Sequence, residues 1–393
     1  MRLLWIATKS PWPPVDGGRV LLLESIRALN EAGAEVTLVA PAVARSGDPA
    51  AGAPAVCDFR PVPVRPRSTA RVLARTLQRG GSWSVSRHRQ PAVSRAVDDL
   101  LAERDFDVVV AEQLQAVAQT APAARRRLPI LLRAQNVESD LWRQAAARSS
   151  GPRRRLLLWQ AKQLARDEAR ALAAVTRTVA LSAEDAEKLR ILAPAARIEP
   201  IPPPFPGELE AGSGTLAGDP AVVLFGSAGW EPNREAETRF VAATWPEVRR
   251  RLPRALLHRF GGGSGSVAGV VTHPAPDESR DAFAAEAILV LPLAIASGVR
   301  MRLLEAWSRG IPVVATPAAA SGLEGRDGEE LLLARDAEEM ADAVARLAAD
   351  RELRERIVAR GRLLLARSHA PRTFAARWLD LCTRVAGGEV GPR

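Results

Sequence analysis

Short apolar runs alternate with amphipathic stretches along most of the 393-residue chain. An apolar run at 2–8 is followed by a glycine-containing turn, an amphipathic stretch at 19–33 and a second apolar run at 35–41. A strand, a turn, a helix and a strand in this order predict a βαβ unit of a parallel sheet. The same alternation predicts further strands at 106–113, 128–136 and 177–182, each near a helical stretch, of which 152–174 is the longest.

The pattern stops between 194 and 220, where seven prolines and four glycines replace any helical period. Prolines at this density favour extended backbone and are typical of a linker. After it the alternation resumes, with strands expected at 221–227, 254–263, 287–294 and 311–317 and helices at 232–252, 300–310, 336–349, 351–366 and 371–385. We therefore predict two doubly wound α/β domains, residues 1–200 and 220–370, joined by a linker at 201–219.

The amino-acid composition limits the class of protein and the kinds of site that the chain can form. Hydrophobic residues make up 47% and charged residues 25% of the chain, as in ordinary globular proteins. No run is long and apolar enough for a membrane span, and the N-terminus lacks a signal-peptide pattern. The two cysteines lie far apart and the four histidines show no ligand spacing, so neither a disulfide framework nor a metal site is expected.

Charge is distributed unevenly. The net charge is +10, and residues 1–200 alone carry +11. A basic half of this kind favours a negatively charged partner, such as nucleic acid, an anionic membrane or a phosphorylated substrate. Nucleic acid is disfavoured because the basic half lacks interleaved aromatic residues and the chain has no tyrosine.

The loops after the strands are the places to look for a ligand site, since open parallel sheets bind ligands beyond the carboxyl ends of their strands. Gly17 and Gly18 follow the first strand and open a helix, although the dinucleotide and Walker spacings are absent. A second glycine loop begins at Gly261. For the first loop a tight turn is the favoured explanation, and for the second a flexible surface loop is an equal alternative.

The segment 291–325 is the most informative. A strand ends near Leu293, a loop of small residues opens a helix, and Arg300 and Arg302 lie at the helix start. Arginine there is disfavoured by the helix dipole, so two of them suggest a bound anion such as a diphosphate, held bidentately. Glu305 is a candidate acceptor for a ribose diol, with an ion pair to Arg302 or Arg309 as the alternative.

The segment 296–316 resembles the donor-binding segment of retaining family-4 glycosyltransferases of the GT-B fold. Other stretches resemble that family in the same order: PPVDGGR at 13–19, AQNVESDLW at 134–142, VVLFGSAGWEPN at 222–233 and the segment 322–350. The resemblance implies two Rossmann-like domains facing across a cleft. It also implies that the C-terminal helix, about 371–385, crosses back to complete the N-terminal domain.

The resemblance also implies roles for residues. Arg300, Arg302 and Glu305 would be catalytic, with the arginines on the donor diphosphate and Glu305 on the ribose. Gln113, Asn136 and Glu138 would lie on the acceptor side, in the N-terminal domain. The donor-binding set implied is Gly17, Gly18, Ser227, Gly261, Ser297, Gly298, Val299, Arg300, Arg302 and Glu305.

Three positions depart from the family pattern. Ser297 stands where the first acid of the E-x7-E element is usual, and Gln135 replaces the histidine before Asn-Val-Glu. The usual Arg…Lys pair after the first strand of the second domain is missing, with Trp230 and Asn233 near those positions. Arg300 and Arg302 would then supply the positive charge on the diphosphate.

The function implied is transfer of a sugar from a nucleotide diphosphate sugar to an acceptor hydroxyl, with retention of configuration and without a metal or other cofactor. The acceptor would be a glycan, a lipid-linked molecule or a small molecule, and the protein would be cytoplasmic. The alternatives are an inactive nucleotide-sugar-binding or scaffold protein of the same fold and, less favoured, a sugar-nucleotide epimerase.

Membrane contact is a separate hypothesis. Two arginine triplets, 125–127 and 153–155, are candidates for meeting an anionic lipid surface on the cytoplasmic face, and the second lies beside Leu156, Leu157, Leu158 and Trp159. Solvated helix ends are the alternative explanation for both triplets.

Overall fold

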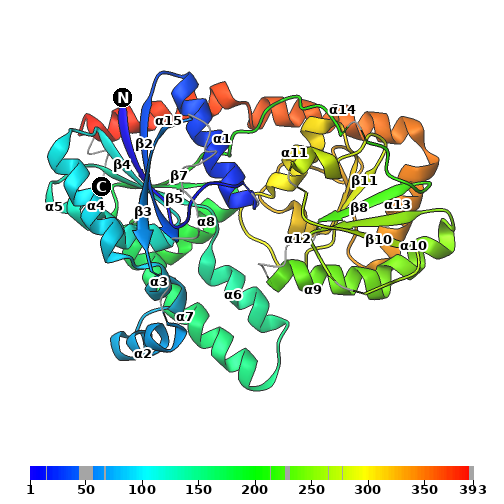
Figure 1. The fold of residues 1–393 in the computed structure, drawn as a ribbon, viewed down its shortest axis with the longest axis horizontal. Helices are drawn as coiled ribbons and strands as arrows, with labels where there is room; N and C mark the ends of the chain where they lie inside the picture. Colours follow the sequence, from blue (N-terminus) through cyan, green and yellow to red (C-terminus); the bar gives the residue numbers. More distant parts are fainter. Residues whose placement is uncertain are drawn as a thin grey trace. The chain divides into compact units, whose positions relative to one another are not determined.

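A computed structural model describes residues 1–14, 16–43, 56–65, 68–212, 214–225, 231–263, 265–276 and 278–388. The chain divides into two compact units (Figure 1). The first contains residues 1–204, 297–299 and 371–393, and the second contains residues 205–296 and 300–370. The sequence analysis placed residues 297–299 in the domain 220–370, whereas in the structure they group with the first unit.

The first unit is built on a seven-stranded parallel sheet in the order β3-β2-β1-β4-β5-β6-β7. This is the doubly wound arrangement expected from alternating strands and helices. Its strands are β1 (Arg2–Ile6), β2 (Glu35–Val43), β3 (Asp58–Val64), β4 (Val108–Glu112), β5 (Ile130–Ala134), β6 (Arg177–Ala180) and β7 (Ile198–Pro200). Its helices are α1 (Gly17–Glu31), α2 (Thr69–Arg79), α3 (Trp83–His88), α4 (Pro91–Glu103), α5 (Ala121–Arg125), α6 (Glu138–Ala147), α7 (Gly151–Ala174), α8 (Ala183–Leu192) and α15 (Pro371–Ala386), with a 3₁₀ helix at Leu114–Thr120.

Strand β3 was not predicted from the sequence. It contains Pro61 and Pro63, which lack the N–H that a central strand needs. In the structure β3 is the first strand of the sheet order and pairs, among the described strands, with β2 alone. An edge position tolerates proline because one side of the strand needs no ladder hydrogen bonds.

Apolar residues cover both faces of this sheet, as in other parallel sheets flanked by helices. One face packs against α15, whose Trp378 stacks on Trp5 of β1 with ring centroids 5.3 Å apart. The C-terminal helix, expected at 371–385, runs from Pro371 to Ala386 and is part of the core of the first unit.

The second unit has a six-stranded parallel sheet in the order β10-β9-β8-β11-β12-β13, again doubly wound. Residues 205–212 of the predicted linker are bonded to this unit: Phe205 N–H donates to His369 O, and Gly212 pairs with Ala284. The strands are β8 (Ala221–Phe225), β9 (Leu256–Phe260), β10 (Val270–His273), β11 (Ile288–Leu291), β12 (Val313–Ala315) and β13 (Leu332–Leu333), and the helices are α9 (Glu231–Arg239), α10 (Trp245–Arg251), α11 (Met301–Arg309), α12 (Pro317–Ala320), α13 (Ala337–Ala349) and α14 (Arg351–Ser368), with a π-helical turn at Phe240–Thr244 between α9 and α10.

Candidate functional site

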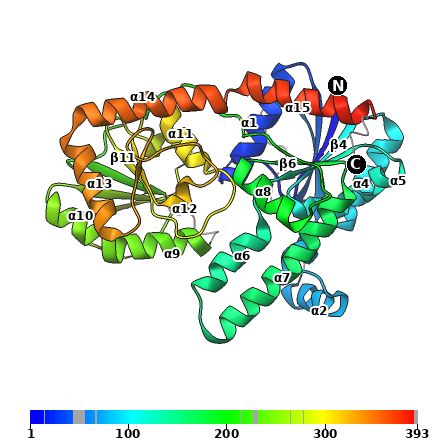
Figure 2. The same ribbon diagram turned by 180° about the vertical axis from the view of Figure 1, so that it is seen from behind.

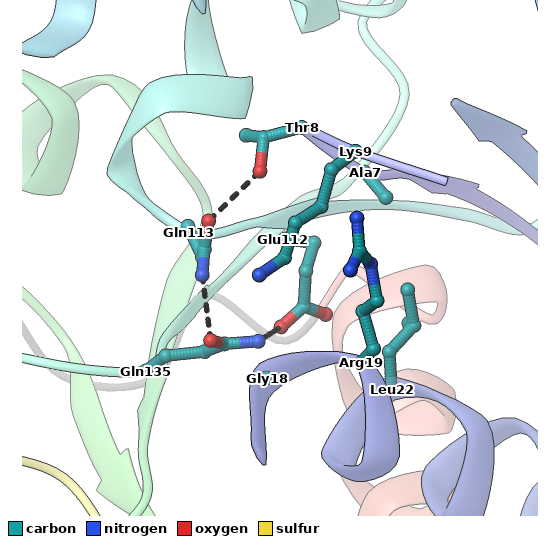
Figure 3. A pocket seen from close by; sticks show the side chains of 9 residues that line it. All are labelled: Ala7, Thr8, Lys9, Gly18, Arg19, Leu22, Glu112, Gln113 and Gln135. Carbon is teal, nitrogen blue, oxygen red and sulfur yellow. Dashed lines mark hydrogen bonds between the residues drawn. The ribbon is translucent and has the colours of Figure 1, made fainter. Parts of the chain in front are cut away.

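A small pocket lies at the carboxyl end of the first sheet, beside the start of α1 (Figure 3). Its position agrees with the rule that open α/β sheets bind ligands at this edge. Predicted residues Gly18 and Gln113 line it, and Gln135 stands beside them. The other lining residues are Ala7, Thr8, Lys9, Arg19, Leu22 and Glu112.

Polar side chains cross this pocket as a continuous chain of hydrogen bonds (Figure 3). Thr8 Oγ1 donates to Gln113 Oε1 at 2.8 Å, and Gln113 Nε2 donates to Gln135 Oε1 at 2.6 Å. Gln135 Nε2 then donates to Glu112 Oε1 at 2.5 Å. Because every link has a fixed donor and acceptor, the chain holds both glutamine amides in one orientation.

Gln113 adopts an uncommon backbone conformation, with φ 71° and ψ 157°. A non-glycine residue held there costs about 1–3 kcal/mol, and such residues concentrate at binding and active sites. The hydrogen bond from Gln113 N–H to Arg133 O and the two side-chain bonds maintain this conformation. The structure therefore gives Gln113 a local reason to be counted among the candidate site residues.

Glu112, which the sequence analysis did not select, forms the base of the pocket. Its carboxylate is 2% exposed and accepts hydrogen bonds from Trp5 Nε1 at 2.7 Å and from Arg133 Nε at 2.8 Å. The Arg133 guanidinium is fully buried, lies over the Trp5 ring at 4.8 Å, and donates to Ser25 Oγ. An acid and a base inside the apolar strands 106–113 and 128–136 were the signal, since buried charges require partners.

The glycine turn at the start of α1 is held by Asp16. Its carboxylate caps the helix by accepting from Arg19 N–H and pairs with Lys9 at 2.8 Å. Although partial burial acts in the opposite direction, Lys9 and Arg19 hold the pKa of Asp16 below its usual value. A Cβ on Gly18 would lie 2.9 Å from Gln135 Oε1, so glycine leaves room for the pocket's glutamine.

The Asn-Val-Glu segment lies at the start of α6. Glu138 begins the helix, and its N–H donates to Glu168 Oε1 of α7 at 2.6 Å. Burial raises the pKa of Glu138, against the effect of hydrogen bonds from Gln115 and Asn136. Burial, together with the nearby Glu138 carboxylate, raises the pKa of Glu168 to about 7. Glu168 was not selected from the sequence, because its place in α7 reads as an ordinary polar helix position.

This carboxyl pair predicts a pH effect on stability. The folded protein keeps a proton on Glu168 up to about pH 7, whereas the usual pKa of a glutamate is 4.5. The free energy of unfolding therefore falls as pH rises between these two values and levels off above them. Glu168→Gln should remove the contribution of Glu168 to this slope, up to about 3 kcal/mol between about pH 5 and pH 8, and leave that of Glu138. Urea unfolding of both proteins from about pH 5 to pH 8 measures it; an unchanged slope in the variant would contradict the assignment.

The loop at Ser297 and Gly298 is bonded within the first unit. Ser297 Oγ accepts from Val137 N–H at 2.8 Å and donates to Asp185 Oδ1 at 3.2 Å, while Gly298 N–H donates to Asp185 Oδ2 at 2.9 Å. Burial raises the pKa of Asp185, although these donors act against it. The position where the family usually has an acid thus carries a serine that hydrogen-bonds a buried aspartate.

Position 298 requires glycine both because of its backbone conformation and because a Cβ would not fit there. Its φ is +69°, and a Cβ there would lie 2.1 Å from Gln135 O. With the Asn136 amide oriented to satisfy its neighbours, its nitrogen donates to Gln135 O at 3.1 Å and to Ser297 O at 2.8 Å. The structure therefore brings Gln135, Asn136, Ser297 and Gly298 together. Val299, the residue after Gly298, is buried.

In the second unit, Glu305 of α11 is the centre of an ionic cluster. Its carboxylate accepts from Arg302 at 2.8 Å, from Arg309 at 3.1 Å and from Ser279 Oγ. Glu305 is 4% exposed, so these contacts lie largely out of solvent. The ion-pair alternative kept open from the sequence is thus realised with both arginines at once.

The cluster fixes Arg302. Its guanidinium is held by Glu305 and lies 4.4 Å from the centroid of the Phe225 ring, at the carboxyl end of β8. The Arg302 side chain remains 25% exposed. Arg300 is the N-cap residue of α11 and is half-buried. Two arginines therefore do stand at this helix start, where the backbone N–H groups also favour an anion.

The second glycine loop follows β9 and begins at Gly261, whose N–H donates to His273 O at 3.1 Å. Arg259 of β9 forms a buried ion pair with Glu237 of α9 at 3.2 Å and donates to Thr272 Oγ1. These charges, neither of which was selected from the sequence, brace the strand end that carries the loop. Ser227 lies outside the described residues.

Two features are absent from the residues that the structure describes. These residues contain no group of three His, Cys, Asp or Glu side chains arranged to hold a metal ion. In the same residues no helix combines the length and the hydropathy needed to cross a bilayer.

Comparisons with known proteins agree with this architecture. The family model described as "Glycosyl transferase 4-like domain" matches residues 16–204, and the model described as "Glycosyl transferase-like" matches residues 223–380. A search of curated protein sequences gave no match.

Solved structures share the fold over nearly the whole chain. Sucrose-phosphate synthase from Thermosynechococcus elongatus superposes with a TM-score of 0.75 at 15% identity, covering 99% of this chain and 100% of that one. HepE from Anabaena, in complex with UDP-glucose, gives a TM-score of 0.68 at 13% identity over 98% and 99% of the two chains. The lipopolysaccharide outer core galactosyltransferase WaaB gives 0.57 at 12% identity over 98% and 99%.

These findings confirm the fold class expected from the alternation of strands and helices. Each unit is a doubly wound parallel α/β sheet, and each half of the chain is matched by a glycosyltransferase model. The chain belongs to the family-4 glycosyltransferases of the GT-B fold.

Proposed function

We propose that this enzyme transfers a sugar from a nucleotide diphosphate sugar to an acceptor hydroxyl, with retention of configuration and without a metal ion or other cofactor. The observation that carries the proposal is the start of α11, where Glu305 and Phe225 hold Arg302 in place at a helix N-terminus. As the glycosidic bond breaks, negative charge builds on the leaving diphosphate. A guanidinium fixed in advance stabilises that charge without reorganising.

A uridine diphosphate sugar is the first donor to test. HepE, which shares the fold, is described in complexes with UDP and glucose and with UDP-glucose. The planar guanidinium of arginine can bind the diphosphate of any nucleotide, so GDP-sugars and dTDP-sugars should be tested beside UDP-sugars.

We assign the acceptor to the pocket of the first unit. Thr8, Gln113 and Gln135 present hydroxyl and amide groups of fixed orientation, which suit the hydroxyls of a glycan, a lipid-linked molecule or a small molecule. Lys9 and Arg19 add positive charge beside them, which suits an acceptor with an acidic or phosphorylated group. The proposal keeps the cytoplasmic location expected from the sequence, with contact to an anionic membrane.

A donor panel with the full-length protein tests the proposal. We expect release of nucleoside diphosphate from one donor class, undiminished by EDTA, and a product whose anomeric coupling constant matches that of the donor. Glu305→Ala should abolish release, because it frees Arg302 and Arg309 together. Binding of donors with no turnover under any condition would instead indicate the inactive binding protein. An inverted product or loss of activity in EDTA would refute retention or metal independence, respectively.

A further inference from the structure

A high concentration of positive charge lies in a helical hairpin to which the proposed transfer reaction assigns no role. Residues 141–166 hold seven arginines and lysines and no aspartate or glutamate. This segment alone has a charge of +7, against +11 for the whole of residues 1–200. All seven side chains are exposed; they are Arg143, Arg148, Arg153, Arg154, Arg155, Lys162 and Arg166.

The segment forms most of α6 and the first two-thirds of α7. Figures 1 and 2 both show these helices leaving the sheet of the first unit as an antiparallel hairpin. The base of the hairpin is tied down: Gln160 Oε1 accepts from Trp83 N–H at 2.9 Å, and Glu168 accepts from the first N–H groups of α6. The far end, from Arg148 to Leu158, is therefore presented on a fixed stem.

Apolar side chains are exposed at the same end. Leu156 is 58% and Leu158 45% exposed on α7, directly after the triplet Arg153–Arg155. Charge alone would suit any polyanion, but two exposed leucines beside arginines need a partner that is both anionic and apolar. A bilayer surface containing anionic lipid meets both requirements, since its headgroups attract arginine and its acyl boundary takes up leucine.

The other arginine triplet, 125–127, lies in a different setting. Arg125 and Arg126 at the end of α5 pair with Asp98 of α4. Large exposed hydrophobic residues in the described part of the chain include Leu156 and Leu158 but none near this triplet in sequence. The two triplets, which looked alike in the sequence, thus differ in structure, and 125–127 becomes the matched control.

We propose that the hairpin tip, residues 148–158, docks this enzyme on an anionic membrane. The arginines supply the long-range attraction, and Leu156 and Leu158 insert at the headgroup level. The proposal concerns binding rather than catalysis, so lipid binding is measurable whether or not a donor has been found.

Vesicle flotation of the full-length protein tests the proposal. We expect binding to phosphatidylcholine vesicles that contain phosphatidylglycerol, at about 0.15 M salt, and none to phosphatidylcholine alone. Changing Arg153, Arg154 and Arg155 together to Gln should lower the partition coefficient by about 100-fold, because each arginine near the surface contributes about fivefold. L156S/L158S should weaken binding to the vesicles, and the binding that remains should be more sensitive to salt.

Two matched variants serve as controls. Changing Arg125, Arg126 and Arg127 together to Gln removes the same charge, and L363S removes a leucine that is 70% exposed on α14; both should bind vesicles as the wild type does. All changed side chains are at the surface, and circular dichroism melting checks that each variant is folded.

Three outcomes would overturn the proposal. The first is failure of the wild-type protein to float with anionic vesicles. The second is an equal loss of binding in the 125–127 variant, which would indicate a response to net charge alone. The third is unchanged binding of L156S/L158S together with tight binding to duplex DNA at the same salt, which would identify the tip as a general polyanion site.

Discussion

Arg302→Ala is expected to lower kcat/KM for the donor by about 100- to 1,000-fold, the usual cost of removing a fixed donor of transition-state charge stabilisation. Arg302 is held on two sides, by Glu305 at 2.8 Å and by the Phe225 ring at 4.4 Å. Its side chain is still 25% exposed, which leaves part of the guanidinium available to a ligand.

The conservative variant separates charge from geometry. Arg302→Lys keeps a positive charge but loses the planar fork and the stacking on Phe225, so its kcat/KM should fall between those of Ala and the wild type. Arg326→Ala, which removes an arginine that is 78% exposed, is the control and should retain wild-type kinetics. If Arg302→Ala stayed within threefold of the wild type, the diphosphate contact proposed for this residue would be wrong.

Arg133→Ala is expected to lower the free energy of unfolding of the first unit by about 3–5 kcal/mol, since it leaves a partner charge buried without its ion pair. Arg133 is fully buried between Glu112, Ser25 and the Trp5 ring. Without it, the Glu112 carboxylate, which is 2% exposed, still accepts hydrogen bonds from Trp5 and Gln135 but has lost the positive charge that balances its own.

Hydrogen exchange in β1 and β5 measures this effect within the first unit. The double variant Glu112→Gln/Arg133→Met removes both charges and should lose less stability than Arg133→Ala, because no unpaired charge remains. Arg170→Ala removes an arginine that is 71% exposed and lies 3.4 Å from Asp167 in the same unit, and it should cost at most about 1 kcal/mol. Equal losses in Arg133→Ala and Arg170→Ala would show that the buried pair is not a determinant of stability.

The fold could be predicted from the sequence because each strand of a parallel sheet is apolar on both faces and each helix has one apolar face. These local patterns gave the alternation, the fold class and the C-terminal helix. They did not give β3, whose Pro61 and Pro63 are tolerated only at a sheet edge, because edge position depends on strand order. The same limit applies to the two-residue β13, which is too short to carry a pattern.

The candidate site was predicted in part. The loops were found because the ends of apolar runs mark where ligands bind in α/β folds. Glu112 and Arg133 were missed, although each interrupts an apolar strand, because nothing local says that they pair with one another. Glu168 and Asp185 lie on helices where an acid is ordinary, and only their burial beside Glu138 and Ser297 makes them notable.

The sequence by itself determined the element types, the two α/β sheets and the uneven charge, because these depend on residue type and spacing along the chain. The tertiary structure decided which charges are neutralised. It paired Arg125 and Arg126 with Asp98, and Arg133 with Glu112. It also decided where the arginines of 148–158 lie, at the exposed tip of a helical hairpin with two exposed leucines. Neutralisation depends on distances of a few ångströms between residues far apart in the chain, and folding alone sets those distances.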